Sequence, residues 1–349
     1  MLLEKTVAEI VPLDQAAMDA AWRHWDSIAK PLRSLGKLEK AVVQMAGIQG
    51  SSQVDIGKKA LLVLCADNGV VEEKVTQTGQ EVTAQVAENF LQEKATAGIL
   101  CRKTGADIFP VDIGIYRDTS IRNCKIAFGT KNMTKGPAMT RAQALQGLET
   151  GIRLAEEKRR EGYRILATGE MGIGNTTTSS AMASVFLGRP AEELTGRGAG
   201  LSSEGLSRKV HAIRKAIEVN QPDPEDPVDV LAKVGGFDIA GMAGVFLGGA
   251  ALRMPVVIDG FISCVAALTA MRICPLAADY MMASHVSREP AAELLLRSIG
   301  KEAFLTCDMC LGEGSGAVML FPLLDMGLEV YNKMATFEEN EIETYVPLS

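Results

Sequence analysis

The chain has 349 residues, of which 47% are hydrophobic and 23% charged, with a formal net charge of −7 and a pI near 5.3. These values are ordinary for a globular protein, and the length suits one large α/β domain or two smaller ones. The acidic balance and an aromatic content of 5% argue against a nucleic-acid partner. No apolar run reaches membrane-spanning length, and the N-terminus lacks the pattern of a signal peptide. We therefore expect a cytoplasmic protein with no membrane partner.

The two ends of the chain differ in pattern from its middle. Residues 13–28 and 38–48 have helical patterns and are separated by Lys30-Pro31, while residues 323–345 are acidic and also helical in pattern. We predict that residues 1–50 join residues 291–349 in a small helical subdomain, which closes the active site of an α/β domain at residues 51–290.

Short apolar runs punctuate the middle of the chain. Residues 60–64, 107–111, 165–167 and 255–258 each lead into a polar or glycine turn and then into a helical stretch. This alternation predicts a Rossmann-like α/β fold with a parallel sheet covered on both faces. In such sheets the ligand binds beyond the carboxyl ends of the strands. Acidic residues recur at those ends, namely Asp67, Asp112, Glu170 and Asp259.

The most informative segment is GEMGIGNTTTSSA, residues 169–181, which follows the third apolar run. Its glycines allow close approach of the backbone to a ligand, and the start of the following helix offers N–H groups to an anion. The spacing nearly matches a P-loop, but Asn175 stands where the P-loop lysine belongs. The loop predicts a site for a single phosphate with Glu170 beside it. The alternatives are a purely structural turn, or a kinase or NTPase.

Two further glycine loops follow. In residues 311–317, LGEGSGA, Glu313 lies between two glycines before an apolar helix. An apolar pocket closing around it would raise its pKa toward that of a general base, whereas the alternative is a solvated surface glutamate. Residues 195–201 enter a helix that carries Lys209. Lys209 can reach a phosphate, and the alternative is an ordinary solvated charge.

Metal and disulfide sites have little support in the sequence. The seven cysteines are scattered, which fits reduced thiols, and Cys307 with Cys310 forms a lone C-x-x-C that is either a redox pair or half a zinc site. The three histidines show no ligand spacing. We expect no metal and no cofactor. Small residues at 235–252 allow close helix packing, with a subunit interface as one alternative.

Together these segments resemble the nicotinate-nucleotide:dimethylbenzimidazole phosphoribosyltransferase family. The likeness runs over essentially the whole chain. It is carried by Lys30-Pro31, SLGKLE (34–39), ADNGV (66–70), EVTAQ (81–85), PVDIGI (110–115), TGEMGIGNTT (168–177), GRGAGL (196–201), DGFIS (259–263), SHVSREP (284–290) and LGEGSGA (311–317). The blocks 168–177 and 311–317 are the most specific.

The resemblance implies a role for each candidate residue. Glu313 is the implied general base, and Glu170 lines the same site. The implied phosphate site comprises Gly172, Gly174, Lys209, Gly314, Ser315 and Gly316. Ribose contacts are implied for Gly198, Asp259, Gly260 and Ser287, and contacts with the base for Thr76, Gln85, Met171 and Leu311.

The implied reaction transfers phosphoribose from nicotinate mononucleotide to an aromatic base, without a cofactor, in a homodimer or in a heterodimer with a paralogue. Some positions depart from the family pattern. Asn68 replaces a common histidine, residues 75–79 lack the usual proline or aromatic, and Ala291-Ala292 replaces Gly-His. These departures leave the acceptor open: dimethylbenzimidazole, another azole, a purine or a phenol. The alternative function is a catalytically weak paralogue that binds nucleotide and supports an active partner.

Overall fold

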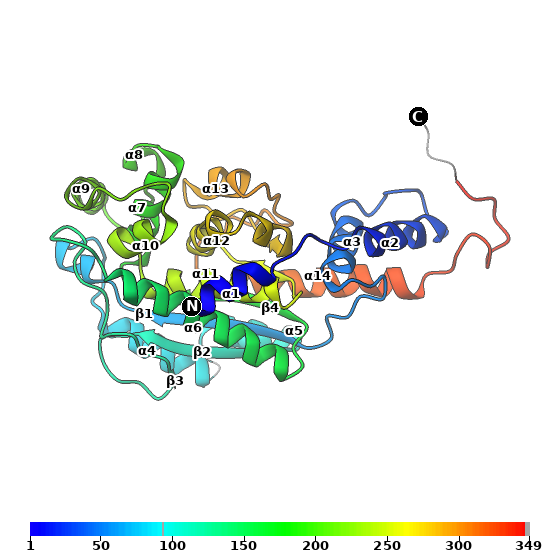
Figure 1. Cartoon of the computed structure of the whole chain (residues 1–349), viewed down its shortest axis with the longest axis horizontal. Coiled ribbons are helices and arrows are strands. Elements are labelled where there is room, and N and C mark those ends of the chain that lie inside the picture. The colour runs from blue at the N-terminus through cyan, green and yellow to red at the C-terminus, as the bar shows by residue number, and fades with distance from the viewer. Residues whose placement is uncertain (93, 346–349) are drawn as a thin grey trace.

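A single parallel sheet organises the chain, of which the computed structural model describes residues 1–92 and 94–345 (Figure 1). Its strands are β1 (Lys59–Ala66), β2 (Ala106–Gly114), β3 (Arg122–Asn123), β4 (Ile165–Met171), β5 (Val256–Ile258) and β6 (Met281–Ala283). They lie in the order β3-β2-β1-β4-β5-β6, and every pairing is parallel. All eight residues of β1 are buried, as expected for a strand covered on both faces. The predicted parallel α/β fold is therefore confirmed.

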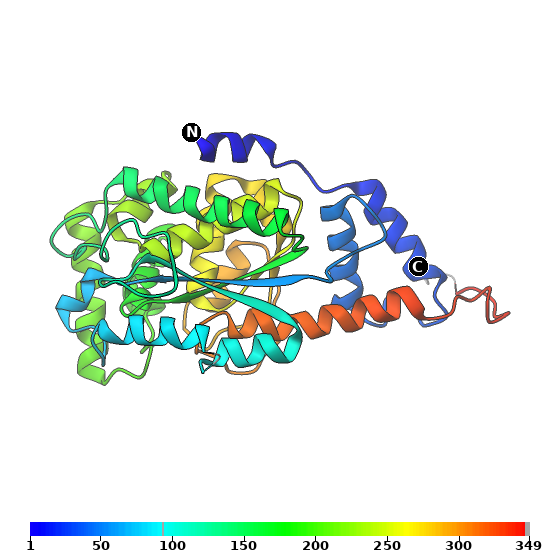
Figure 2. The ribbon, with the colours of Figure 1, turned by 90° about the horizontal axis from the view of Figure 1, so that it is seen from below.

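Helices cover both faces of the sheet, with α6 on one side and α4 and α5 on the other (Figure 2). The first half of the chain holds α1 (Leu2–Glu9), α2 (Gln15–Ser27), α3 (Lys37–Gln49), the 3-10 helix η1 (Gly69–Glu73), α4 (Glu81–Leu91), α5 (Thr96–Thr104) and α6 (Arg141–Arg160). The second half holds α7 (Asn175–Leu187), α8 (Ala191–Leu194), α9 (Ser203–Asn220), α10 (Pro227–Val234), α11 (Phe237–Ala251), α12 (Phe261–Ile273), the 3-10 helix η2 (Pro275–Tyr280), α13 (Ala292–Ser298) and α14 (Ser315–Lys333).

The small residues of 235–252 form most of α11, which packs inside the chain. A Cβ on Gly244 would lie 1.9 Å from the carbonyl oxygen of Leu148, and one on Gly151 would lie 1.9 Å from that of Gly241. Helices α6 and α11 therefore touch through their backbones, which only glycine permits here. Residues Phe237 to Ala250 of α11 are all buried. The close packing is confirmed, and it is intramolecular, so the alternative of a subunit interface at this segment is wrong.

The helices at the two ends of the chain do not all pack in one place. Helices α2 and α3 lie beside α14, away from the sheet (Figure 1), and an isolated bridge joins Ile28 to Thr336. Helix α1 instead packs on α6 and α11 of the large domain. Helix α14 ends at Lys333, so the predicted helix over 323–345 is correct only in its first half. Residues 346–349 of the predicted subdomain lie outside the described residues.

The strand order places the site. The sheet is built outward in both directions from β1 and β4, so the connections after these two neighbouring strands leave on opposite sides. Ligands bind in the crevice that forms at such a switch point. No helix in the described part of the chain is both long and apolar enough to cross a membrane.

Candidate active site

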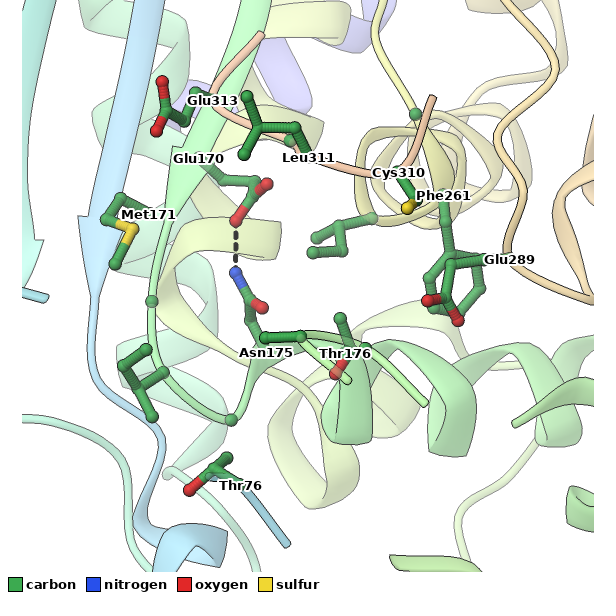
Figure 3. A pocket seen from close by; sticks show the side chains of 18 of the residues that line it. Thr76, Glu170, Met171, Asn175, Thr176, Phe261, Glu289, Cys310, Leu311 and Glu313 are labelled. Carbon is green, nitrogen blue, oxygen red and sulfur yellow. Dashed lines mark hydrogen bonds between the residues drawn. The ribbon is translucent and has the colours of Figure 1, made fainter. Parts of the chain in front are cut away.

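A cavity of about 350 Å³ opens at the carboxyl ends of β4, β5 and β6. Its wall comes mainly from residues 75–78, 170–176, 259–263 and 310–313, with Lys209 from α9. Figure 3 shows Met171 on one side, Phe261 and Glu289 on the other, and Glu170 between them. The predicted place for the ligand, beyond the strand ends, is thus where the cavity lies.

Glu170 is a buried residue at the end of β4, only 6% exposed. Burial, reinforced by the nearby charges of Asp238 and Asp259, raises its pKa to about 8. The side-chain amide of Asn175 donates a hydrogen bond to Glu170 Oε2 (Figure 3), which opposes part of that rise. The rise favours the protonated form of Glu170, whereas a bound cation would favour its ionised form.

Glu313 sits in a strained loop next to Glu170. Its φ of 62° lies in the left-handed region, between Gly312 at 90° and Gly314 at 83°. A non-glycine residue in this conformation costs about 1–3 kcal/mol, and such strain gathers at functional sites. Its Oε2 accepts a hydrogen bond of 3.0 Å from the backbone N–H of Ala97, at the start of α5. Burial raises the pKa of Glu313, and that hydrogen bond acts against the rise.

Lys209 supplies the cavity's buried cation. Its ammonium group donates to Thr176 Oγ1 at 2.8 Å and to the carbonyl oxygen of Gly196 at 3.1 Å. Burial lowers the pKa of Lys209 to about 8. Gly198 has a φ of 51°, in the left-handed region that favours glycine, and a Cβ there would lie 3.0 Å from Thr176 Oγ1, the hydroxyl that Lys209 contacts. The predicted phosphate lysine therefore lies against the start of α7.

Asp259, which follows β5, is bound to the second glycine loop. Its Oδ2 accepts from the N–H of Gly314 at 3.2 Å and its Oδ1 from the N–H of Ala317 at 3.0 Å. Burial raises the pKa of Asp259, while the nearby His285 and the N–H groups of this loop oppose the rise. The N-terminus of α14 is therefore already occupied by a carboxylate of the same chain.

Most of the predicted site residues meet in this cavity. Its wall includes Thr76, Glu170, Met171, Gly172, Gly174, Gly198, Lys209, Asp259, Gly260, Ser287, Leu311 and Glu313. The exceptions are Gln85, Gly314, Ser315 and Gly316, which are not among the lining residues. Gln85 is exposed on α4, where its neighbour Val86 lines the cavity instead. None of residues 1–50 lines the cavity, and among the described residues 291–345 the lining ones belong to 310–313.

Several lining residues have no predicted role. Asn175 donates a hydrogen bond to Glu170, and Thr176 accepts one from Lys209. Phe261, Glu289 and Cys310 also line the cavity (Figure 3). All except Cys310 lie inside the segments that carry the family resemblance, so those segments point to them without saying which side chains face the ligand.

The C-x-x-C segment lies at the rim. Cys307 and Cys310 are both exposed free thiols, and Cys310 belongs to the cavity wall. Within the described residues, no group of three or more His, Cys, Asp or Glu side chains is arranged to hold a metal ion.

Comparison with known proteins decides the family. A family model described as "Phosphoribosyltransferase" matches residues 10–342. The chain belongs to the nicotinate-nucleotide–dimethylbenzimidazole phosphoribosyltransferase family. It is 46% identical to the protein of that name from Acetivibrio thermocellus, over 99% of both chains, and 46% identical to the one from Ruminiclostridium cellulolyticum, over 100% of both. The crystal structure of CobT from Thermus thermophilus superposes with a TM-score of 0.90 at 36% identity, covering 94% of this chain and 99% of that one.

The family resemblance predicted from the sequence is thereby confirmed, and the chain is a phosphoribosyltransferase of this kind.

Proposed function

We propose that the chain transfers the 5-phosphoribosyl group of nicotinate mononucleotide to an aromatic lower-ligand base. The product is an α-nucleotide, α-ribazole 5′-phosphate or an analogue, with nicotinate released, for assembly of the nucleotide loop of a cobamide. The observation that carries the proposal is the meeting of three groups in one cavity: the buried carboxyl group of Glu170, the half-buried one of Glu313 and the buried ammonium group of Lys209.

The donor phosphate is assigned to the start of α7. Lys209 supplies the positive charge, and the dipole of the helix that begins at Asn175 adds to it. Lys209 has no ion-pair partner within 4 Å in the described residues, so its charge is available to a ligand. A phosphate there would also raise the depressed pKa of Lys209, because it compensates the burial.

The chemistry then takes place beside Glu170. The C1′–N bond to the pyridinium breaks, and its electron pair leaves with nicotinate, so positive charge develops on C1′. Glu170, ionised by the arriving cation, stabilises that charge. An azole nitrogen attacks C1′ from the opposite face, which inverts the configuration and forms the α-linkage.

Glu313 is the proposed base for the remaining proton. The attacking azole carries a proton on its other ring nitrogen, and Glu313 accepts that proton as the new C–N bond forms. Its raised pKa suits a general base better than that of an ordinary surface glutamate. To act, Glu313 must present an oxygen to the azole and weaken its hydrogen bond to Ala97, a small rotation of a side chain on a loop.

The acceptor is assigned to the side of the cavity near residues 75–90. Val75, Val86 and Met171 offer apolar surface there, and Thr76 turns its hydroxyl to the carbonyl oxygen of Thr78. Each buried methyl group of a base gains only about 1 kcal/mol, so related azoles, purines and phenols are competing substrates.

The direct test is a panel of these bases with nicotinate mononucleotide and the purified chain, with products separated by chromatography. The expected result is an α-linked nucleotide with at least one base. Formation of only β-linked product, or magnesium-dependent ATP hydrolysis instead, would contradict the proposal.

A further inference from the structure

Glu289 is a carboxylate in the cavity wall, and one of its oxygens has no hydrogen-bond partner in the described part of the chain. It lies on a loop after β6, and the unpartnered atom is its buried Oε2. That oxygen packs closely against Gly196, since a Cβ atom added to this glycine would lie 1.9 Å from it. Because Oε2 is covered by the protein, a ligand in the cavity meets the rest of the carboxylate, which forms part of the wall.

The position of Glu289 relative to Lys209 restricts the ligand group that it can meet. Both side chains reach Gly196, since Lys209 donates to its carbonyl oxygen at 3.1 Å and Glu289 packs on its Cα. The two charges do not form an ion pair within 4 Å in the described structure, although the charge of Glu289 favours the protonated form of Lys209. Glu289 therefore flanks the phosphate site without occupying it.

An ionised carboxylate accepts hydrogen bonds and repels anions. Nicotinate mononucleotide carries two anionic groups, the phosphate and the nicotinate carboxylate, and its donors next to the phosphate are the ribose 2′- and 3′-hydroxyls. The acceptor base meets Glu313, which lies across the cavity from Glu289 (Figure 3). The ribose hydroxyls are therefore the donor groups of the nucleotide whose chemistry suits a carboxylate beside the phosphate site.

We propose that Glu289 binds the ribose hydroxyls of the donor and thereby selects a ribonucleotide over a deoxyribonucleotide. This inference rests on the proposed function, because it takes nicotinate mononucleotide as the donor. Glu289 is a substrate-binding residue in this account, and its wall position beside Ser287 and Phe261 orients the sugar so that C1′ faces Glu170.

The test compares kcat/KM for nicotinate mononucleotide and its 2′-deoxy and 3′-deoxy analogues in the wild type, Glu289→Ala and Glu289→Gln. A hydrogen bond to a charged group predicts a preference of about 10- to 100-fold for the ribonucleotide over at least one deoxy analogue in the wild type. In Glu289→Ala that preference should fall to within about threefold, since the missing hydroxyl then has no partner to lose. Glu293→Gln, an exposed carboxylate paired with Arg297 on α13, is the control and should keep the wild-type preference.

A structural role for Glu289 would lower kcat/KM for all three nucleotides by the same factor, which would overturn the inference, as would a wild type that does not discriminate. Binding of the three nucleotides is measured in parallel by calorimetry. If no base yields product, the transferase proposal fails, while the ratio of binding constants still supports or rejects the role of Glu289. Thermal unfolding of each variant separates loss of folding from loss of contact.

Discussion

The chain contains two glycine loops that resemble each other in sequence but differ in what lies at the helix that follows. Residues 169–174 lead into α7, and residues 311–314 lead into α14. At α14, Asp259 accepts hydrogen bonds from the N–H groups of Gly314 and Ala317. At α7 the N–H groups of Asn175, Thr177 and Thr178 donate to the carbonyl oxygens of Gly172 and Gly174, and in the described part of the chain no carboxylate caps this helix.

The comparison shows why a helix N-terminus alone does not define an anion site. The positive end of a helix attracts any anion, including a carboxylate of the same chain. Asp259 accepts hydrogen bonds from N–H groups at the start of α14, so these groups are not free to bind a phosphate. The loop before α14 still carries Glu313 into the cavity wall. At α7 the neighbouring group is the Lys209 ammonium, which extends the positive site. In the proposed mechanism, the loop before α14 therefore presents the base and the loop before α7 binds the phosphate.

The largest expected effect comes from Glu313→Gln, which tests the role of the second loop. Loss of the proton acceptor should lower kcat by about 10²- to 10⁴-fold, the usual worth of a general base. The glutamine can still accept from the N–H of Ala97, so the unfolding temperature should change little. Steady-state kinetics check this, and near-normal turnover would remove Glu313 from the mechanism.

Lys209→Met tests the first loop. The substitution keeps most of the buried volume and removes the charge, so KM for the nucleotide should rise by about 10- to 150-fold, equivalent to 1.5–3 kcal/mol. KM for the base should stay within about twofold of the wild type. The matched control is Lys215→Met on the same helix, at a position outside the cavity wall. Equal losses for both substrates would mean that Lys209 is structural.

The pKa of Glu170 predicts a pH dependence of stability. Burial raises this pKa from an ordinary 4.5 to about 8, so between these values the folded chain holds a proton that the unfolded chain has released. The free energy of unfolding should therefore fall as pH rises through this window, by at most about 1.4 kcal/mol per pH unit. Denaturant titrations of the wild type and Glu170→Gln check the sign. The variant should show a flatter curve, and parallel curves would contradict the assignment.

The smallest expected effect comes from Asp259, and it tests whether this residue caps α14 or helps to bind the phosphate. Asp259→Ala should lower the free energy of unfolding by about 0.5–2 kcal/mol, because α14 loses its cap. Asp259→Asn keeps an acceptor and should lose less. If Asp259→Ala instead weakened nucleotide binding as much as Lys209→Met and left stability unchanged, the distinction between the two loops would be wrong.

Much of this was predictable from sequence because strands, turns and glycine loops have local signatures. The parallel sheet followed from apolar runs ending in turns, and the positions of Glu170 and Lys209 followed from the loops beside them. Asp259 was predicted to contact the sugar. The hydrogen bond that it accepts from Ala317 at the start of α14, however, joins two residues 58 positions apart in the sequence. No local pattern encodes that contact.

The direction in which a side chain points was the other feature that the sequence did not predict. Gln85 belongs to a recognisable segment, yet on α4 it is exposed while Val86 turns to the cavity. One position on a helix changes direction by about 100°. Glu289 lies in an equally recognisable segment, but its unpaired oxygen becomes visible only when Gly196 is packed against it.

The most direct test of the account is the configuration of the product made by the isolated chain. Nicotinate mononucleotide and 5,6-dimethylbenzimidazole are incubated with the purified protein, and the nucleotide formed is analysed by NMR at C1′. The account predicts an α-linked nucleotide and an equal amount of nicotinate, with no requirement for ATP. Nucleotide binding without any α-linked product would contradict it and would favour a weak paralogue that supports an active partner subunit.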